Sequence, residues 1–203
     1  MLKPTFLCAA ALAAVFSTAP TTGEDARLRA DGQRFQIDPS HSTVLFRVQH
    51  LKSAPFYGRF NEISGEFTID SEDPENSSLQ VTIPVASIDS NNGKRDEHLR
   101  SSDFFSAKEF DTITLRSTSV EKASEESYRV TGELTLRGET RELVFVVNHT
   151  GTAELSPNFG LRSGYETTFT IDRTDYGMDY YAEQGVLGKD VQITVAIEGM
   201  IPR

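Results

Sequence analysis

Four histidines are the side chains in this sequence best suited to acid–base or metal chemistry: His41, His50, His98 and His149. They are scattered along the chain, and no two of them stand four residues apart on a helical segment, as a zincin-type site requires. The sequence therefore predicts no metal site.

Two further arrangements of polar residues favour structure over catalysis. Asp38 and His41 can face one another across a turn, which we interpret as a hydrogen-bonded turn. The segment 172–183 has Asp, Gly and Glu at the first, sixth and twelfth positions of a calcium loop. Thr174 and Tyr176 occupy its third and fifth ligand positions, however, so an EF-hand is excluded. No nucleophile elbow or phosphate-binding glycine loop occurs, and the sequence predicts no enzyme.

The N-terminus is typical of an export signal. Lys3 precedes an apolar run over residues 6–16 that is too short to span a bilayer, and small residues follow it. We expect residues 1–22 to be a signal peptide and 23–203 to form one mature domain in the periplasm. The single cysteine, Cys8, falls in the leader, so the mature domain is expected to have no disulfide and no thiolate ligand.

Charge and hydropathy limit the partners. Thirty acidic residues against twenty basic ones give a net charge of −10, so a nucleic-acid backbone would be repelled. Hydrophobic residues make up 37% of the chain, enough for a packed core, but no apolar run is long enough for an integral membrane segment in the mature chain. The sequence does not decide between a monomer and a homodimer.

The elements that must position any site alternate in polarity, as β-strands do. This pattern predicts about eight strands, at residues 44–50, 65–69, 79–85, 113–115, 128–136, 143–147, 167–171 and 191–197. Short polar turns such as 137–140 predict antiparallel neighbours. We therefore expect an all-β protein, an antiparallel up-and-down barrel.

One connection differs from the tight turns. Residues 90–111 are long and charged, and Asp96 stands four residues before Arg100, a spacing that brings the two together on a helix. We expect a short helical lid segment near residues 91–107. Since a helix of two turns is unstable alone, Leu99, Phe104 and Phe105 must pack on the open end of the barrel.

The inward face of the strands is apolar but includes small residues, Gly65, Gly132 and Thr167. This mixture favours an elongated apolar cavity, in which a hydrocarbon tail would gain about 0.8 kcal/mol per buried methylene. A barrel filled by its own side chains is the alternative.

Ordered motifs along the chain resemble the YceI-like family. They stand at residues 37–42, 44–50, 58–60, 87–89, 95–101, 103–105, 132–138 and 172–178. The sequence departs from the family at Leu115, where Phe is usual, and at Asp172, where Asn is frequent. The resemblance implies a bacterial, periplasmic, lipocalin-like barrel that holds a polyisoprenoid chain lengthwise, with the polar head near one opening.

The resemblance also implies which residues touch the ligand. The tail contacts are expected at inward strand positions, namely Val44, Phe46, Val48, His50, Phe67, Val81, Ile83, Ile113, Leu115, Phe145, Phe169, Ile171, Ile193 and Val195. Arg95, Asp96 and His98 lie in the lid motif, where they either meet the head group or form an ion-pair and capping network.

The sequence therefore favours a binding or carrier protein for an amphiphilic lipid, a polyisoprenoid or an isoprenoid quinone, that requires no cofactor and performs no catalysis. Two alternatives remain. One is an enzyme or stress-response factor acting on such a lipid, with His50 or His98 as acid or base. The other is an interaction module with a filled barrel.

Overall fold

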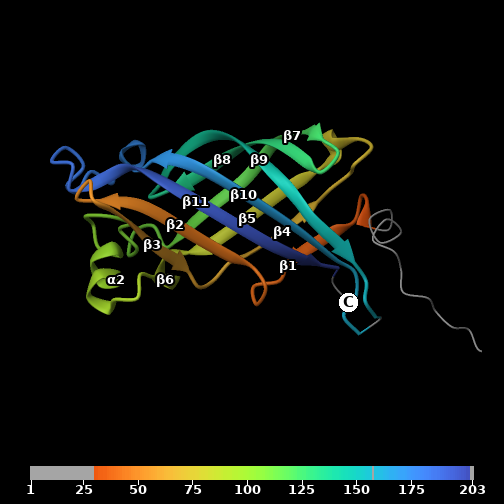
Figure 1. Cartoon of the computed structure of the whole chain (residues 1–203), viewed down its shortest axis with the longest axis horizontal. Helices are drawn as coiled ribbons and strands as arrows, with labels where there is room; N and C mark the ends of the chain where they lie inside the picture. Colours follow the sequence, from red (N-terminus) through yellow and green to blue (C-terminus); the bar gives the residue numbers. More distant parts are fainter. Residues whose placement is uncertain (1–29, 157, 202–203) are drawn as a thin grey trace, which may run out of the picture.

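The computed structural model of the protein describes residues 30–156 and 158–201 (Figure 1). The expected signal peptide, residues 1–22, lies outside the described residues. The described residues are mostly β-structure and include one short α-helix.

The strands follow one another along the chain with few interruptions. They are β1 (Arg34–Ile37), β2 (Thr43–His50), β3 (Ala54–Phe60), β4 (Ser64–Thr68), β5 (Ser78–Pro84), β6 (Ile88–Asp89), β7 (Thr112–Ser124), β8 (Ser127–Leu136), β9 (Glu139–Ala153), β10 (Arg162–Asp172) and β11 (Leu187–Met200). The helix α2 spans Gly93–Leu99, and three short 3₁₀ turns are η1 (Pro74–Asn76), η2 (Val85–Ser87) and η3 (Arg173–Tyr176).

The sheet closes into a barrel of eight antiparallel strands. The order β1-β4-β5-β7-β8-β9-β10-β11 returns to its start because β11 also pairs with β1, at Gly199 and Met200. From Leu187 to Ala196 the same edge of β11 pairs with β2 instead. Beyond β2 the sheet continues into β3 and then β6, which lie outside the ring.

The expected antiparallel barrel is confirmed, and each predicted strand is present. The tight connection after β8 is a two-residue turn at Arg137 and Gly138, both with positive φ, as a type I′ hairpin requires. The sequence did not reveal β1, β3 or β6. Pro55 and Gly58 interrupt the apolar pattern of β3, and this strand has a long partner on one side only, where such residues are tolerated.

One end of the barrel is filled by side chains. Phe35 stacks on Phe67 with ring centroids 5.2 Å apart, and Phe67 meets Tyr165 edge-on at 5.2 Å. Phe35, Phe67 and Tyr128 are at most 2% exposed. A small apolar void of about 30 Å³ remains beside Phe67, Tyr128 and Tyr165, but the stacked rings block this end to a ligand.

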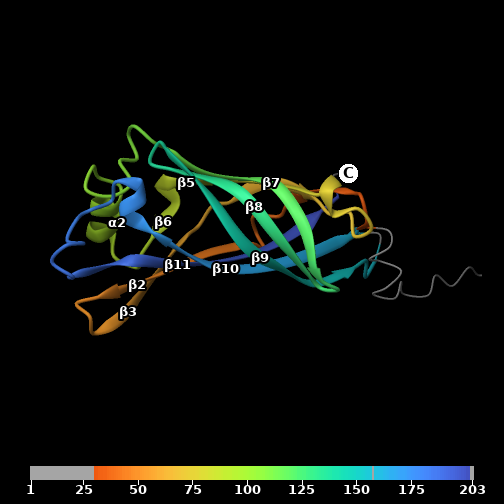
Figure 2. The same ribbon diagram turned by 90° about the horizontal axis from the view of Figure 1, so that it is seen from above.

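The opposite end carries α2, the tip of the β2–β3 hairpin and the loop that leads into β11, which lie together in both views (Figures 1 and 2). Figure 2 shows the β2–β3 hairpin diverging from the other strands. Asn92 caps α2, since its side chain accepts a hydrogen bond from the Arg95 amide. The lid segment is present, but only Gly93–Leu99 is α-helical.

The helix predicted from the Asp96–Arg100 spacing is present, and the Arg100 amide donates to the Asp96 carbonyl at 3.0 Å, but the side chain of Asp96 bonds elsewhere. The Asp96 carboxylate accepts hydrogen bonds from the Ser90 amide, at 2.8 Å, and from the Ser90 hydroxyl. Ser90 is 3% exposed, and a buried donor without a partner is costly. Hydrogen bonding of the Asp96 carboxylate to buried Ser90 therefore stabilises the fold more than an exposed ion pair with Arg100 would, since such pairs contribute little.

Candidate functional site

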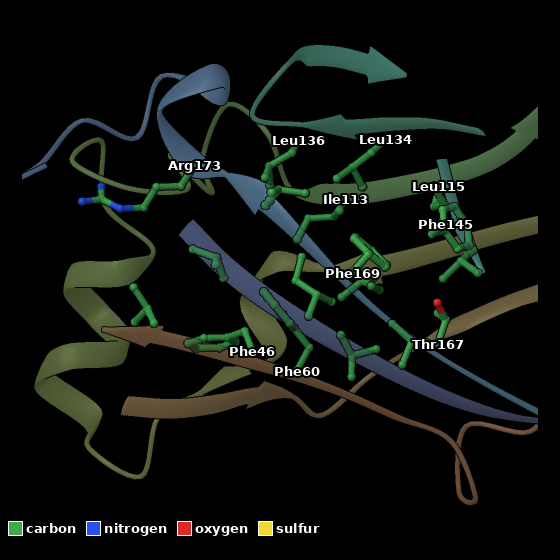
Figure 3. Close-up of a pocket in the computed structure, with 18 of the residues that line it drawn as sticks. Phe46, Phe60, Ile113, Leu115, Leu134, Leu136, Phe145, Thr167, Phe169 and Arg173 are labelled. Carbon is green, nitrogen blue, oxygen red and sulfur yellow. The ribbon is translucent and has the colours of Figure 1, made fainter. Parts of the chain in front are cut away.

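An apolar cavity occupies the barrel between the closed end and the lid (Figure 3). Its volume is about 140 Å³. Strands of the ring, β2, β3 and the lid segment all contribute to its wall. The lining residues include Val44, Phe46, Val48, Phe60, Leu79, Val81, Ile83, Leu99, Phe104, Phe105, Ile113, Leu115, Leu134, Leu136, Phe145, Val147, Tyr165, Phe169, Ile171, Met178, Leu187, Val191, Ile193, Val195 and Ile197.

The cavity is long for its volume. Along β11 its lining runs from Leu187 to Ile197; at about 3.3 Å per residue, with the tilt of a barrel strand, this is roughly 25 Å along the barrel axis. The lining residues of β11 are only half-buried although they point inward, as is typical of the wall of a cavity that opens to solvent. The length and the apolar wall of the cavity suit a single extended chain.

Three polar residues lie along the lining: Glu166, Thr167 and Arg173. Glu166 is exposed and alternates with the buried Tyr165 and Thr167 along β10, so its carboxylate faces away from the cavity. The Thr167 hydroxyl donates a hydrogen bond to the Val146 carbonyl at 2.7 Å. The Arg173 guanidinium is 3% exposed and lies at the lid end of the cavity (Figure 3). Neither group is placed to attack or protonate a ligand, so the wall acts through shape and apolar surface.

Arg173 fastens the loop that closes the lid end. Its Nε donates to the Gly188 carbonyl at 2.7 Å, and its Nη2 donates to the carbonyls of Tyr180 and Leu187 at 3.0 and 3.1 Å. Its Nη1 donates to the Met178 carbonyl. Burial lowers the pKa of this guanidinium, although the nearby Asp179 and Asp172 oppose that shift. One buried cation thus holds four backbone oxygens of residues 178–188.

Aromatic rings form the wall beneath the lid. Phe60 lies between Phe46, at 5.9 Å, and Phe105, at 5.7 Å, measured between ring centroids. Phe46 lies directly over Gly58 of the paired strand, because a β-carbon at that position would be 2.2 Å from Phe46 Cζ. The glycine therefore gives the ring the space that it needs.

Most of the predicted tail contacts lie on the cavity wall. These are Val44, Phe46, Val48, Val81, Ile83, Ile113, Leu115, Phe145, Phe169, Ile171, Ile193 and Val195. Two do not lie there. His50 is exposed at the end of β2, where the strand has passed beyond the barrel interior. Phe67 is packed in the closed end beside Phe35 and Tyr165.

The three lid residues do not line the cavity either. The Arg95 guanidinium lies 4.2 Å from the centre of the Phe56 ring and donates to the hydroxyl and carbonyl of Ser90. His98 Nε2 lies 2.8 Å from Asp103 Oδ2, and its ring meets Phe104 and Tyr180 edge-on. Their contacts fasten α2 to β3, to Ser90 and to the loop that leads into β11.

Some wall residues were missing from the predicted contacts. Phe60 ends a strand that the sequence did not reveal, and Met178 and Leu187 lie in or beside an irregular loop. Arg173 follows β10 directly, where a charged residue after a strand is ordinarily taken for a solvated turn. The motif at residues 172–178, which contains Arg173, is the signal that the sequence offers for this position.

The remaining histidines belong to structural networks. His149 Nδ1 lies 2.8 Å from Glu126 Oε2 and Nε2 lies 2.8 Å from Thr152 Oγ1, whose hydroxyl lies 2.8 Å from that of Ser163. Thr152 and Ser163 are buried and not in the cavity lining. This network therefore stabilises the closed end instead of addressing a ligand.

Asp38, His41 and Glu198 cluster at the bend between β1 and β2. His41 Nδ1 donates to Asp38 Oδ2 at 3.0 Å, and Arg162 Nη1 donates to both Asp38 and Glu198. The His41 hydrogen bond, with those from Arg162 and Ser40, lowers the pKa of Asp38 to about 2, although burial opposes the shift. The three groups are close enough to hold a cation, but the guanidinium of Arg162 already bridges the two carboxylates.

Within residues 30–156 and 158–201, no helix combines the length and apolar character needed to cross a membrane.

Curated relatives match the chain over nearly its full length. A UPF0312 protein of Pseudomonas aeruginosa is 34% identical over 200 residues, which cover 98% of this chain and 99% of the relative. A UPF0312 protein of Photorhabdus laumondii is 32% identical over 200 residues, covering 98% of each.

Solved structures share the fold. Burkholderia cenocepacia BcnA has a TM-score of 0.71 at 22% identity, covering 80% of this chain and 98% of that one. The Campylobacter jejuni YCEI protein has a TM-score of 0.68 at 27% identity, covering 76% and 90%. A polyisoprenoid binding domain from Saccharophagus degradans has a TM-score of 0.65 at 16% identity, covering 83% and 98%. The family described as YceI-like domain matches residues 35–199, and the chain belongs to that family.

Proposed function

We propose that this protein binds the hydrocarbon chain of an isoprenoid lipid, a polyisoprenoid or an isoprenoid quinone, inside its barrel and carries it through the periplasm. The observation that supports this most is the long, narrow apolar cavity, closed at one end by Phe35, Phe67 and Tyr128 and covered at the other by the lid segment. A single chain buried over that length gains affinity from each methylene.

Comparison with known proteins supports the same ligand class. One structure with this fold is a polyisoprenoid binding domain. The export signal expected at residues 1–22 supports a periplasmic location, because such a leader directs the chain out of the cytoplasm.

The cavity wall favours binding without catalysis. His50 and His98, the residues of the enzymatic alternative, do not line it, and the hydroxyl of Thr167 is engaged by a backbone carbonyl. Glu166 borders the wall, but its side chain is exposed on the outer face of β10. General acid–base catalysis needs a titratable group within hydrogen-bond reach of the reacting atom. A bound chain would meet carbon on nearly all sides.

Native mass spectrometry of the protein purified from a bacterial envelope, followed by organic extraction, tests the proposal. We expect one isoprenoid molecule per barrel. Val195→Phe fills the cavity and should remove most of this ligand, whereas Val146→Phe, on the outer face of β9, should retain it. A protein that is empty and also refuses added isoprenoids would refute the proposal and favour an interaction module.

A further inference from the structure

Exposed apolar residues gather at the lid end of the barrel. Leu51, at the tip of the β2–β3 hairpin, is 58% exposed; Tyr181, in the loop leading into β11, is 47% exposed. With Tyr180 and Lys52, which lie beside them in the chain, we call this set the rim. Tyr and Leu next to Lys is the composition of surfaces that meet lipid, since apolar side chains enter the acyl boundary and the ammonium meets phosphate.

Backbone hydrogen bonds attach the rim to the cavity. The Leu51 amide donates to the Val186 carbonyl at 2.7 Å, and the Leu187 amide donates to the Tyr181 carbonyl at 3.4 Å. Leu187 itself lines the cavity. The Tyr180 ring lies 5.3 Å from the Phe104 ring, which also lines the cavity. The rim is therefore continuous with the place where the cavity opens.

Three residues of the rim have a backbone conformation that is costly for side chains of their size. Leu51, Lys52 and Tyr181 have φ values of 52°, 53° and 54°, in the left-handed region that Gly or Asn adopts at far lower cost. At Leu51 and Lys52 this conformation belongs to the β2–β3 hairpin turn, in which the Ser53 amide donates to the His50 carbonyl at 3.0 Å. The turn requires the φ values but does not explain why Leu and Lys occupy it. Here their side chains gain little from the core, because Leu51 and Tyr181 point into solvent.

We infer that the rim docks on the surface of a lipid bilayer, placing the open end of the cavity against the acyl chains from which its ligand enters. Lys52, whose side chain lies across Gly185, would contact a lipid phosphate. The inference rests on the proposed function for the identity of the ligand. The contact with the bilayer can be measured without any ligand.

Flotation with phosphatidylcholine vesicles tests the docking. Leu51→Asn and Tyr181→Asn should each lower the partition coefficient about tenfold, as loss of one buried apolar side chain predicts. Asn suits the left-handed backbone, so both variants should fold. Leu155→Asn removes an equally apolar residue, 80% exposed, at the opposite end of the barrel and should change partition by less than about twofold.

A tryptophan reporter gives an independent readout, because the chain contains no Trp. Emission from Tyr181→Trp should shift to the blue on adding vesicles, and that from Phe159→Trp, at the far end, should not. Equal loss of flotation in the Leu51 and Leu155 variants, or no vesicle binding by the unmodified protein, would overturn the docking. If the rim variants then lost capture of an envelope protein, a protein partner would replace the bilayer. Isoprenoid binding measured without vesicles separates failure of docking from failure of the proposed function.

Discussion

Individual buried polar groups decide how the strands meet at each end of the barrel. Asp38 joins the bend after β1 to β10 through His41 and Arg162. Arg173 joins the end of β10 to the start of β11 through carbonyl oxygens alone. Each group is buried, so removing its charge or its donors leaves buried partners unpaired and lowers the free energy of unfolding.

Asp38 should make stability depend on acidity. Because its pKa is about 2 in the folded protein, against the ordinary 3.8, it stabilises the fold fully above the ordinary value and loses this effect as pH falls through the folded value. The shift corresponds to about 2 kcal/mol. In urea denaturation at neutral pH, the free energy of unfolding of the wild type should exceed that of Asp38→Asn by about that amount. The difference between the two free energies should narrow between about pH 4 and pH 2. A constant difference would contradict this account.

Arg173→Ala should lower the free energy of unfolding by more than about 3 kcal/mol, because it leaves the carbonyls of residues 178, 180, 187 and 188 without a donor. The stability of Arg173→Lys should lie between that of the wild type and that of Arg173→Ala, since one ammonium cannot reach all four oxygens. Arg129→Ala removes the same charge from the exposed face of β8 and should cost less than about 0.5 kcal/mol. Similar losses in the two alanine variants would contradict the account.

The lid segment is less stable than the strands of the barrel. α2 has only seven residues and none of them is buried, so it depends on its cap and on the packing of Leu99 over the cavity. Elements of this kind open locally, well below the free energy of global unfolding.

Asn92→Ala should therefore raise amide hydrogen exchange in residues 93–100 about fivefold, equivalent to the loss of a cap worth about 1 kcal/mol. Amides in β8 and β9 serve as the internal control and should exchange at unchanged rates. An increase spread evenly over the barrel would show that the helix and the strands unfold together.

Strand periodicity predicted every strand of the ring except β1, and it placed twelve predicted contacts on the cavity wall, because a side chain that must face an enclosed apolar space follows the two-residue repeat. The repeat does not show where a strand extends beyond the barrel interior, so it predicts an inward side chain for His50, which is exposed. It is also silent on irregular segments, so Phe105 was assigned to the lid by packing alone, and Arg173 was missed. Asp96 shows a third limit, since spacing predicts which residues meet on a helix but not which partner is buried.

At the scale of the whole molecule, the proposed function requires the barrel to take up one chain along the length of its cavity. A cavity of about 150 Å³ holds a molecule the size of benzene, and the volume found here is about 140 Å³. A long isoprenoid must therefore move the half-buried side chains of β11 or the lid as it enters.

Affinity for linear prenyl alcohols should rise with chain length and then level off. Each added isoprene unit buries further carbon, which should raise affinity by about tenfold or more until the extended chain exceeds roughly 25 Å. Displacement of an environment-sensitive fluorescent probe would measure this series. Affinity that is independent of length would contradict a lengthwise binding mode.

The most direct test of the central claim is to map where a bound chain lies. An isoprenoid carrying a photoreactive diazirine would be bound, irradiated and located by peptide mass spectrometry. On β9 the inward Phe145 and Val147 line the cavity, whereas Val144 and Val146 between and beside them are exposed on the outer face. Labelling of Phe145 and Val147 with the outer pair unmodified is the predicted result. Labelling of Val144 and Val146 instead would place the lipid outside the barrel and contradict the account.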